Sequence, residues 1–155
     1  MPLYVIRSLS DPLINLLADD PVRPEIPAEF RVSATAEIFV LQDKDTLEPE
    51  AVVCVSYHDM IPADILELAR DSEGELTTAV FYTIWSYKPK AGRKLIQAAQ
   101  KYIGNNYATI TEFVTLSPQT DMARRFHMLN GAQEFRINGD TVNYLYKSKS
   151  QGFLE

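Results

Sequence analysis

Short runs of apolar, β-branched and aromatic residues recur along the chain and predict strands. TTAVFYTIW at 77–85 and AVVCVSY at 51–57 are two of these runs. Polar or glycine-containing turns separate neighbouring runs, as at Asn138-Gly139-Asp140, a strong hairpin signal. The predicted strands are 3–9, 33–41, 51–57, 77–85, 108–116, 133–137 and 141–146.

Other segments place their apolar residues with helical spacing. Between Leu95 and Ile103 these residues recur at i, i+1, i+4, i+7 and i+8, which marks one face of an amphipathic helix that Gly104-Asn105 ends. Further helices are predicted from Pro12, from Pro62 to near Gly74, and from Ser117-Pro118 to Asn130-Gly131. The last of these has a face composed of Met122, Ala123, Phe126 and Leu129.

The order of these elements predicts a mixed α/β (α+β) fold. Segment 77–116 has the form of a β-α-β crossover, so its two strands are expected to be parallel and connected in the right-handed sense. The other strands form mainly antiparallel hairpins. The proline-rich segment 19–30 is expected to be an irregular connection. We therefore expect one domain over residues 1–155, with a mostly antiparallel sheet covered by helices.

Composition excludes several classes of protein. No apolar run approaches the roughly 18 residues of a membrane span, and no signal peptide is evident, so we expect a soluble, cytoplasmic protein. Cys54 is the only cysteine, which excludes an intrachain disulfide and a zinc site with several thiolates. No spacing of His, Asp and Glu indicates a metal site.

The charge is distributed unevenly along the chain. The formal net charge of −6 is unfavourable for general binding of nucleic acid, so we expect no nucleic-acid partner. Residues 1–75 hold 16 acidic and 5 basic residues, whereas residues 76–155 hold 5 acidic and 10 basic residues. The two halves either serve a cationic and an anionic partner, respectively, or are two solvated faces of the protein.

The most basic turn is SYKPKAGRKLI at 86–96, between a predicted strand and a predicted helix. A helix N-terminus binds anions through its unpaired N–H groups and its dipole, and the lysines and arginine here would strengthen such a site. Pro89 lacks an N–H, and the segment does not match a P-loop or a dinucleotide fingerprint. An anion site and an ordinary basic helix start both remain open.

From residue 33 to residue 146 the order of elements resembles that of the GNAT superfamily of acyl-CoA-dependent N-acyltransferases. In that family the turn after the fourth strand has the pattern (Q/R)xxGx(G/A), and its amides bind the CoA pyrophosphate. The resemblance assigns Tyr87 to the Gln/Arg position and Lys90 and Gly92 to the two small-residue positions, of which only Gly92 keeps the motif.

A second segment, TDMARRFHMLNGA at 120–132, resembles the family pattern N-x-x-A-x-x-x-Y-x-x-x-G-F. Ala123 and Gly131 are in register, while Thr120 replaces the Asn and His127 replaces the Tyr. In the family this tyrosine commonly protonates the departing CoA thiolate. His127 is the corresponding candidate acid if it is protonated or suitably hydrogen-bonded, or else a hydrogen-bonded structural histidine.

The resemblance also implies helices on both faces of the sheet and an opening between the fourth and fifth strands. There the pantetheine arm would bond to strand backbone near 83–85. Glu112 and His58 are candidate bases, and each is alternatively a residue with no catalytic role. The residues that would contact the cofactor are Ile84, Trp85, Tyr87, Lys88, Lys90, Ala91, Gly92, Arg93 and Thr120.

The function implied by the resemblance is acyl transfer from acetyl-CoA, or another short acyl-CoA, to an amine on a small molecule or peptide. The acidic first half of the chain motivates the hypothesis that this acceptor is cationic. The altered turn keeps a second hypothesis open, a GNAT-shaped binding or assembly protein without CoA affinity. A nucleotide or RNA binder is a third. A homodimer through edge strands or the terminal hairpin is compatible with the sequence. We expect no association with a membrane.

Overall fold

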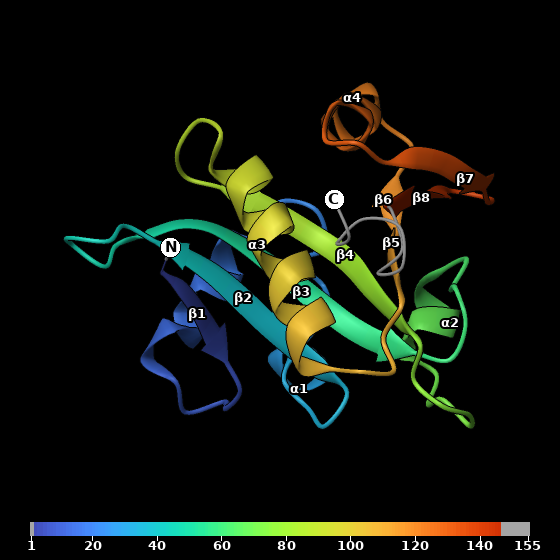
Figure 1. Cartoon of the computed structure of the whole chain (residues 1–155), viewed down its shortest axis with the longest axis horizontal. Coiled ribbons are helices and arrows are strands. Elements are labelled where there is room, and N and C mark those ends of the chain that lie inside the picture. Colours follow the sequence, from blue (N-terminus) through green and yellow to red (C-terminus); the bar gives the residue numbers. More distant parts are fainter. Residues whose placement is uncertain (1, 147–155) are drawn as a thin grey trace. The chain divides into compact units, whose positions relative to one another are not determined.

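The computed structural model of the chain describes residues 2–146 (Figure 1). The strands are β1 Leu3–Ile6, β2 Ala36–Gln42, β3 Pro49–His58, β4 Thr78–Ser86, β5 Glu112–Thr115, β6 Ser117–Pro118, β7 Gln133–Ile137 and β8 Thr141–Tyr146. The helices are the 3-10 helix η1 Pro12–Asp19 and the α-helices α1 Ala28–Arg31, α2 Ile65–Ala69, α3 Ala91–Asn106 and α4 Asp121–Leu129.

The described strands form an eight-stranded sheet in the order β1-β2-β3-β4-β5-β8-β6, with β7 paired to β8. Strands β4 and β5 are parallel, with Thr78 opposite Glu112, and α3 connects them. The pairs β1–β2, β2–β3, β5–β8, β6–β8 and β7–β8 are antiparallel. The predicted fold class, a mixed and mostly antiparallel sheet with a β-α-β crossover, is confirmed.

Two compact units make up the described residues. The first holds the residues up to Ser56 together with Thr83–Tyr102, and the second holds Tyr57–Tyr82 together with the residues from Ile103 onward. Strand β4 therefore contributes its first part to the second unit and its last part to the first.

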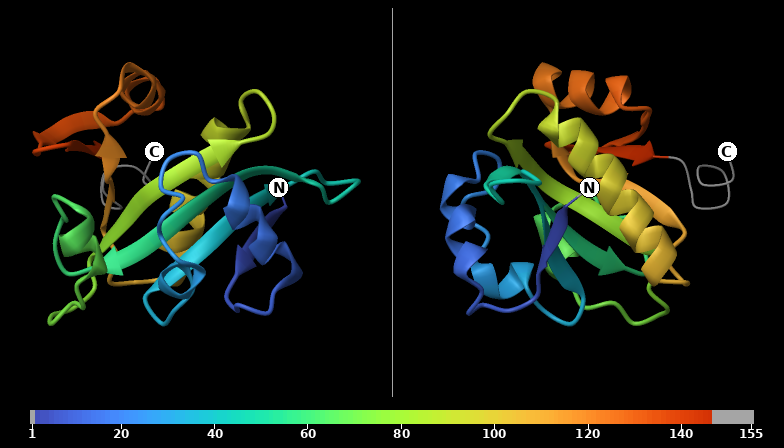
Figure 2. Two further views of the ribbon diagram at one scale, coloured as in Figure 1. Left: turned by 180° about the vertical axis from the view of Figure 1, so that it is seen from behind. Right: turned by 60° about the vertical axis from the view of Figure 1, so that its left-hand side comes forward.

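In the first unit, helices cover both faces of the strands. Ile38 and Cys54 are paired and share one face of β2 and β3, while Phe39 points to the other face. The Phe39 ring contacts Tyr102 of α3 with 5.5 Å between ring centroids. Arg31 of α1 lies 3.5 Å from the Cys54 sulfur on the opposite face. Helices α3 and α1 thus lie on opposite sides, as the right-hand view of Figure 2 shows.

The short helices depart from the sequence prediction in two places. The helix predicted from Pro12 forms, as a 3-10 helix capped by the Asp11 carboxylate. The expectation that the segment up to residue 30 is irregular is wrong at its end, because α1 begins directly after Pro27. Proline is compatible with a helix start, where its missing N–H has no intrahelical partner. Helix α2 ends at Ala69, not near Gly74.

The fifth strand is shorter than predicted. Residues 108–116 are β-like in sequence, but β5 begins only at Glu112. A turn precedes it, in which the Ile110 amide donates to the Tyr107 carbonyl at 3.1 Å. The amides of Thr111 and Glu112 both donate to the Thr77 carbonyl, at 2.9 and 3.1 Å. Residues 108–111, which were expected to begin the strand, therefore form the turn that returns the chain from α3 to the sheet.

The start of α4 was also predicted wrongly. Ser117-Pro118 pairs with β8 as the short strand β6, so it does not begin the helix. Helix α4 begins at Asp121, and the Thr120 hydroxyl accepts a hydrogen bond from the Ala123 amide at 3.1 Å as its N-cap. The predicted stop is confirmed, because Gly131 follows the helix with a φ of 99°, which favours glycine.

The predicted apolar face of α4 is buried only in part, because Ala123 and Phe126 are half-buried. Met122 and Leu129 are 81% and 73% exposed, whereas His127 is 5% exposed. The His127 ring is stacked on Tyr144 of β8, with 5.2 Å between ring centroids. Aromatic packing of this kind buries a polar ring and leaves two larger apolar side chains in solvent. A count of apolar residues at helical spacing could not anticipate that.

The described residues contain neither a helix suited to a membrane nor a cluster suited to a metal ion. No helix among residues 2–146 is long and apolar enough to cross a lipid bilayer. The same residues contain no group of three or more His, Cys, Asp or Glu side chains arranged to hold a metal ion.

Candidate functional site

The turn between β4 and α3 spans residues 87–90, and all four are exposed. Backbone hydrogen bonds hold both ends of this turn. The Tyr87 amide donates to the Glu50 carbonyl of β3 at 2.8 Å, and the Ala91 amide donates to the Lys88 carbonyl at 3.2 Å. The position of the α3 N-terminus in the first unit is therefore fixed by its connection to β4 and β3.

The first turn of α3 contains unpaired amides, of which that of Arg93 belongs to an exposed residue and that of Gly92 to a buried one. Within residues 2–146 no acceptor is recorded for the N–H groups of Gly92 and Arg93, while the Lys94 amide already donates to the Lys90 carbonyl at 3.3 Å. Helix α3 is 16 residues long and has no acidic residue in its first turn. Free N–H groups and the positive end of the dipole favour an anion at this position.

Lys90, in the turn before α3, has a backbone conformation that is unusual for a residue with a side chain. Lys90 has a φ of 67°, in the left-handed region that favours glycine. The family resemblance places the first small residue of the pyrophosphate motif at this position. A lysine adopts this backbone conformation at a cost in strain, because its Cβ crowds the following carbonyl.

Replacing Lys90 by glycine is expected to raise the free energy of unfolding by about 0.5 to 1 kcal/mol. Relief of the left-handed strain outweighs the greater entropy that glycine gives the unfolded chain. Lys94→Gly is the matched control, because Lys94 is exposed on the same helix. That change should lower the free energy of unfolding by about 1 kcal/mol. Urea denaturation measures both. A loss of stability in Lys90→Gly would contradict the assigned conformation.

The basic side chains of the turn are mostly available to solvent. Lys90 and Arg93 are exposed. The Lys88 ammonium lies 3.3 Å from the Glu50 carboxylate, and both side chains are accessible to water. Exposed ion pairs of this kind contribute about 0 to 1 kcal/mol, so a more highly charged anion can compete for Lys88.

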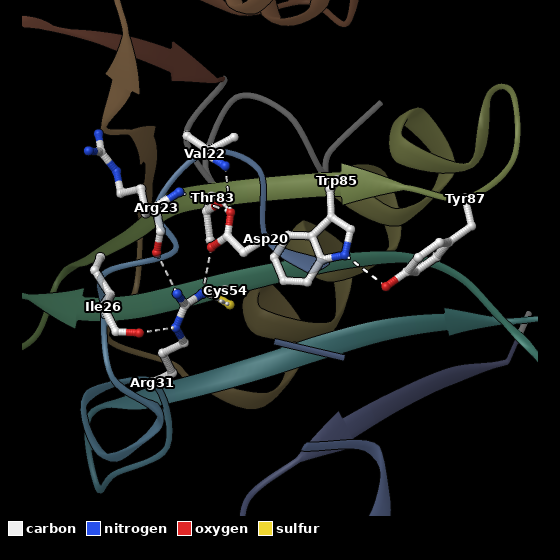
Figure 3. A network of polar contacts seen from close by, with 9 residues as sticks. All are labelled: Asp20, Val22, Arg23, Ile26, Arg31, Cys54, Thr83, Trp85 and Tyr87. Carbon is white, nitrogen blue, oxygen red and sulfur yellow. Dashed lines mark hydrogen bonds and ion pairs between the residues drawn. The ribbon is translucent and has the colours of Figure 1, made fainter. Parts of the chain in front are cut away.

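Tyr87 is engaged with other residues of the first unit. Its hydroxyl accepts a hydrogen bond from the Trp85 indole at 3.0 Å and donates one to the Asp19 carboxylate at 2.7 Å. Figure 3 shows the first of these bonds along the last part of β4. Burial raises the pKa of Tyr87; the Trp85 bond lowers it, and the Asp19 carboxylate adds to the rise. The residue at the Gln/Arg position of the motif is thus held by η1.

A buried ion pair lies beside the same part of β4 (Figure 3). The Arg31 guanidinium is 2.7 Å from the Asp20 carboxylate, and both side chains are almost fully buried. The Thr83 hydroxyl donates to the other Asp20 oxygen at 2.8 Å. Arg31 also donates to the carbonyls of Ile26 and Arg23. The Asp20–Arg31 pair therefore connects η1 and α1 with Thr83 of β4. The next residue is Ile84, for which the sequence predicts a role in binding pantetheine.

Opposing effects determine the ionisation of Asp20. Burial favours its neutral form, but hydrogen bonds from the amides of Arg23 and Val22, from Arg31 and from Thr83 favour the carboxylate. Together they hold the pKa of Asp20 below its usual range. Asp20 and Arg31 are consequently both charged at neutral pH. The sequence did not indicate this network, because charged residues in a proline-rich segment are usually exposed.

His127 lies in the second unit, buried between α4 and β8. Its Nδ1 is 2.8 Å from the Tyr146 hydroxyl. Its ring is stacked on Tyr144 and meets the Phe126 ring edge-on, with 5.1 Å between centroids. Burial lowers the pKa of His127 from 6.5 to about 4. The imidazole is therefore neutral at pH 7 and hydrogen-bonded to Tyr146, and its role as an acid stays a prediction.

The two candidate bases of the second unit are connected through one backbone segment. The Thr77 amide donates to the His58 carbonyl at 2.9 Å, and the Thr77 carbonyl accepts from the Glu112 amide at 3.1 Å. His58 is buried, and this burial lowers its pKa despite the opposing effect of Asp59. Glu112 is partly exposed. Their assignment as bases stays a prediction.

Some residues around these groups were not anticipated from the sequence. They are Asp19, which holds Tyr87, and Tyr144 and Tyr146, which surround His127. The two tyrosines are two positions apart in β8 and so share a face, which the sequence could have indicated. No local pattern relates them to α4.

Comparison with solved structures identifies the fold. Malonyl-CoA decarboxylase from Agrobacterium vitis matches with a TM-score of 0.75 and 22% identity, over 94% of this chain and 60% of that one. A GNAT family acetyltransferase from Elizabethkingia anophelis with acetyl-CoA bound gives 0.62 and 10%, over 94% and 97%. The PaiA N-acetyltransferase from Thermoplasma acidophilum, in complex with coenzyme A, gives 0.59 and 11%, over 95% and 99%.

These likenesses show that the chain has the GNAT fold, as the resemblance in its sequence implied. Identities this low define the fold alone. The chain spans only 60% of the length of the decarboxylase that it matches. No family model matches the sequence, and no curated protein matches it. The chain is thus a divergent protein of the GNAT fold.

Proposed function

We propose that the protein binds a short acyl-CoA, acetyl-CoA in the first instance, and transfers its acyl group directly to an amine. One observation supports this most strongly. The chain has the fold of acetyltransferases solved with acetyl-CoA and with coenzyme A, and its α3 begins with unpaired amides at the turn where the family binds pyrophosphate. The Gly92 and Arg93 amides would receive the pyrophosphate, and Lys88, Lys90 and Arg93 would neutralise its charge.

The acyl-CoA thioester supplies an activated carbonyl, which the amine attacks as the C–S bond breaks. Residues of the chain must assist this reaction in two ways. One is removal of a proton from the amine, for which Glu112 or His58, directly or through water, is the candidate base. The other is stabilisation of the negative charge of the leaving thiolate, for which His127 is the candidate. A cationic acceptor fits the acidic first half of the chain.

Decarboxylation of a malonyl-type thioester is a second candidate function. The observation that favours it is the TM-score of 0.75 to malonyl-CoA decarboxylase, against 0.62 for the acetyltransferase with acetyl-CoA bound. In this reaction the bond to the carboxylate breaks, CO₂ leaves, and a proton adds to the resulting enolate carbon. The same α3 turn would bind the CoA portion in both reactions.

A pair of assays separates the candidates. Acetyl-CoA is incubated with the protein and a panel of polyamines and lysine peptides, and free thiol is measured. Malonyl-CoA is incubated alone, and CO₂ and acetyl-CoA are measured. Amine-dependent thiol release supports acyl transfer, and CO₂ release without an amine supports decarboxylation. Absence of both reactions together with absence of CoA binding would favour the remaining hypothesis, a GNAT-shaped binding or assembly protein without CoA affinity.

A further inference from the structure

The polar environment of His127 consists of a single group in the described part of the chain. The Tyr146 hydroxyl lies 2.8 Å from Nδ1, and no other hydrogen bond to the imidazole is recorded among residues 2–146. The remaining contacts are with rings, since Tyr144 is stacked on the imidazole and Phe126 meets it edge-on. His127 and Tyr146 are 5% and 4% exposed. The hydrogen bond is therefore shielded from water.

The chemistry of the two groups determines which one donates. Burial keeps both neutral, because it lowers the pKa of His127 to about 4 and raises the pKa of Tyr146. A phenol O–H is a stronger donor than an imidazole N–H, and an imidazole nitrogen is a stronger acceptor than a phenol oxygen. The Tyr146 O–H accordingly donates to Nδ1. The proton of the neutral ring is then on Nε2.

We propose that Tyr146 is a positioning residue for His127, holding the imidazole in the Nε2–H tautomer so that Nε2–H donates a hydrogen bond to the negative charge developing on the substrate thioester. This inference rests on the proposed function. In acyl transfer the charge develops on the departing sulfur, and in decarboxylation it develops on the enolate oxygen. The role needs no proton transfer from His127, which suits a neutral imidazole better than the role of an acid.

The test compares Tyr146→Phe with Tyr144→Phe. Both changes remove one hydroxyl from the same face of β8, but no hydrogen bond of the Tyr144 hydroxyl is recorded among the described residues, and its ring only stacks on His127. We expect kcat to fall about tenfold in Tyr146→Phe with KM nearly unchanged, as for loss of one hydrogen bond that acts in the transition state. Tyr144→Phe should change kcat by less than about twofold.

Nitrogen NMR of the histidine rings at pH 7 gives a readout that a merely structural role would not change. The wild-type protein and Tyr144→Phe should show His127 protonated only at Nε2, and Tyr146→Phe should show a mixture of tautomers. An Nδ1–H tautomer in the wild-type protein, or equal kcat values in the two variants, would overturn the inference. If the wild-type protein turns over no acyl-CoA, the proposed function fails and the catalytic role of Nε2–H fails with it, while the NMR spectrum still decides the direction of the hydrogen bond.

Discussion

Replacing Arg31 by alanine is expected to lower the free energy of unfolding by about 3 to 5 kcal/mol, because the change leaves the buried Asp20 carboxylate without its ion-pair partner. The side chains of Arg31 and Asp20 are 1% and 0% exposed, so the ion pair is shielded from bulk water. Urea denaturation measures the loss. Trp85, the only tryptophan, lies in the same unit and reports on it by fluorescence.

Two further variants make the Arg31 measurement specific. Arg125→Ala removes an exposed arginine from α4 and should change the free energy of unfolding by less than about 0.5 kcal/mol. The double variant Asp20→Ala with Arg31→Ala should be less destabilised than the sum of the two single changes, because it leaves no unpaired charge. Additive losses, or a loss in Arg31→Ala no larger than that in Arg125→Ala, would contradict the buried pair.

Lowering the pH from 7 to 4 is expected to remove about 3 kcal/mol of stability through His127 alone. The folded protein holds this imidazole neutral, with its pKa lowered from 6.5 to about 4, whereas the unfolded chain protonates it near its ordinary value. The unfolded state therefore binds more protons between pH 6.5 and 4. Stability is complete above this window and is lost as the pH falls through it. Each unit of pKa difference corresponds to about 1.4 kcal/mol.

The His127→Gln variant isolates this contribution. Urea denaturation at pH 7 and pH 4 should show a difference smaller by about 3 kcal/mol in the variant than in the wild-type protein. His58, whose pKa burial also lowers, contributes in the same direction and remains in the variant, so part of the pH dependence will persist. Asp20 loses its charge only below its lowered pKa, outside this window. Equal pH dependence in the two proteins would show that His127 is not held neutral by burial.

Much of the fold could be predicted from the sequence, because its strongest elements are locally consistent. The strand 77–85 and the helix that follows both have the correct period and clear end signals, so β4 and α3 differ from their predicted ranges by only a few residues at each end. Errors arose where two local preferences competed. Residues 108–111 favour a strand by composition but form the turn after α3, and Ser117-Pro118 has a helix-start pattern but pairs with β8. Long-range pairing with β8 decided the second case, and the return of the chain from α3 to the sheet decided the first.

The candidate site was predictable only in part, for a related reason. The resemblance in the sequence identified the turn before α3 and His127, because both belong to contiguous motifs. The Tyr146 hydroxyl and the Asp20–Arg31 pair come from segments far apart in the sequence, and no spacing rule relates them to their partners. The conformation of Lys90 was likewise hidden, because a lysine at a left-handed position gives no compositional signal.

Charge reversal at the start of α3 provides the variants for a test of the proposed CoA site. Arg93→Glu places a negative charge beside the amides that would receive the pyrophosphate. Lys101→Glu makes the same change of charge eight residues further along the helix. This separation is about 12 Å, beyond the Debye length at physiological ionic strength. Affinity for acetyl-CoA should fall about tenfold in the first variant and stay within about twofold in the second.

Calorimetric titration of the wild-type protein with acetyl-CoA tests most directly the claim that this GNAT-fold chain binds an acyl-CoA. We expect one molecule to bind per chain with a dissociation constant in the micromolar range, and the Arg93→Glu and Lys101→Glu variants to differ as stated. Absence of binding to the wild-type protein at millimolar acetyl-CoA would contradict the claim.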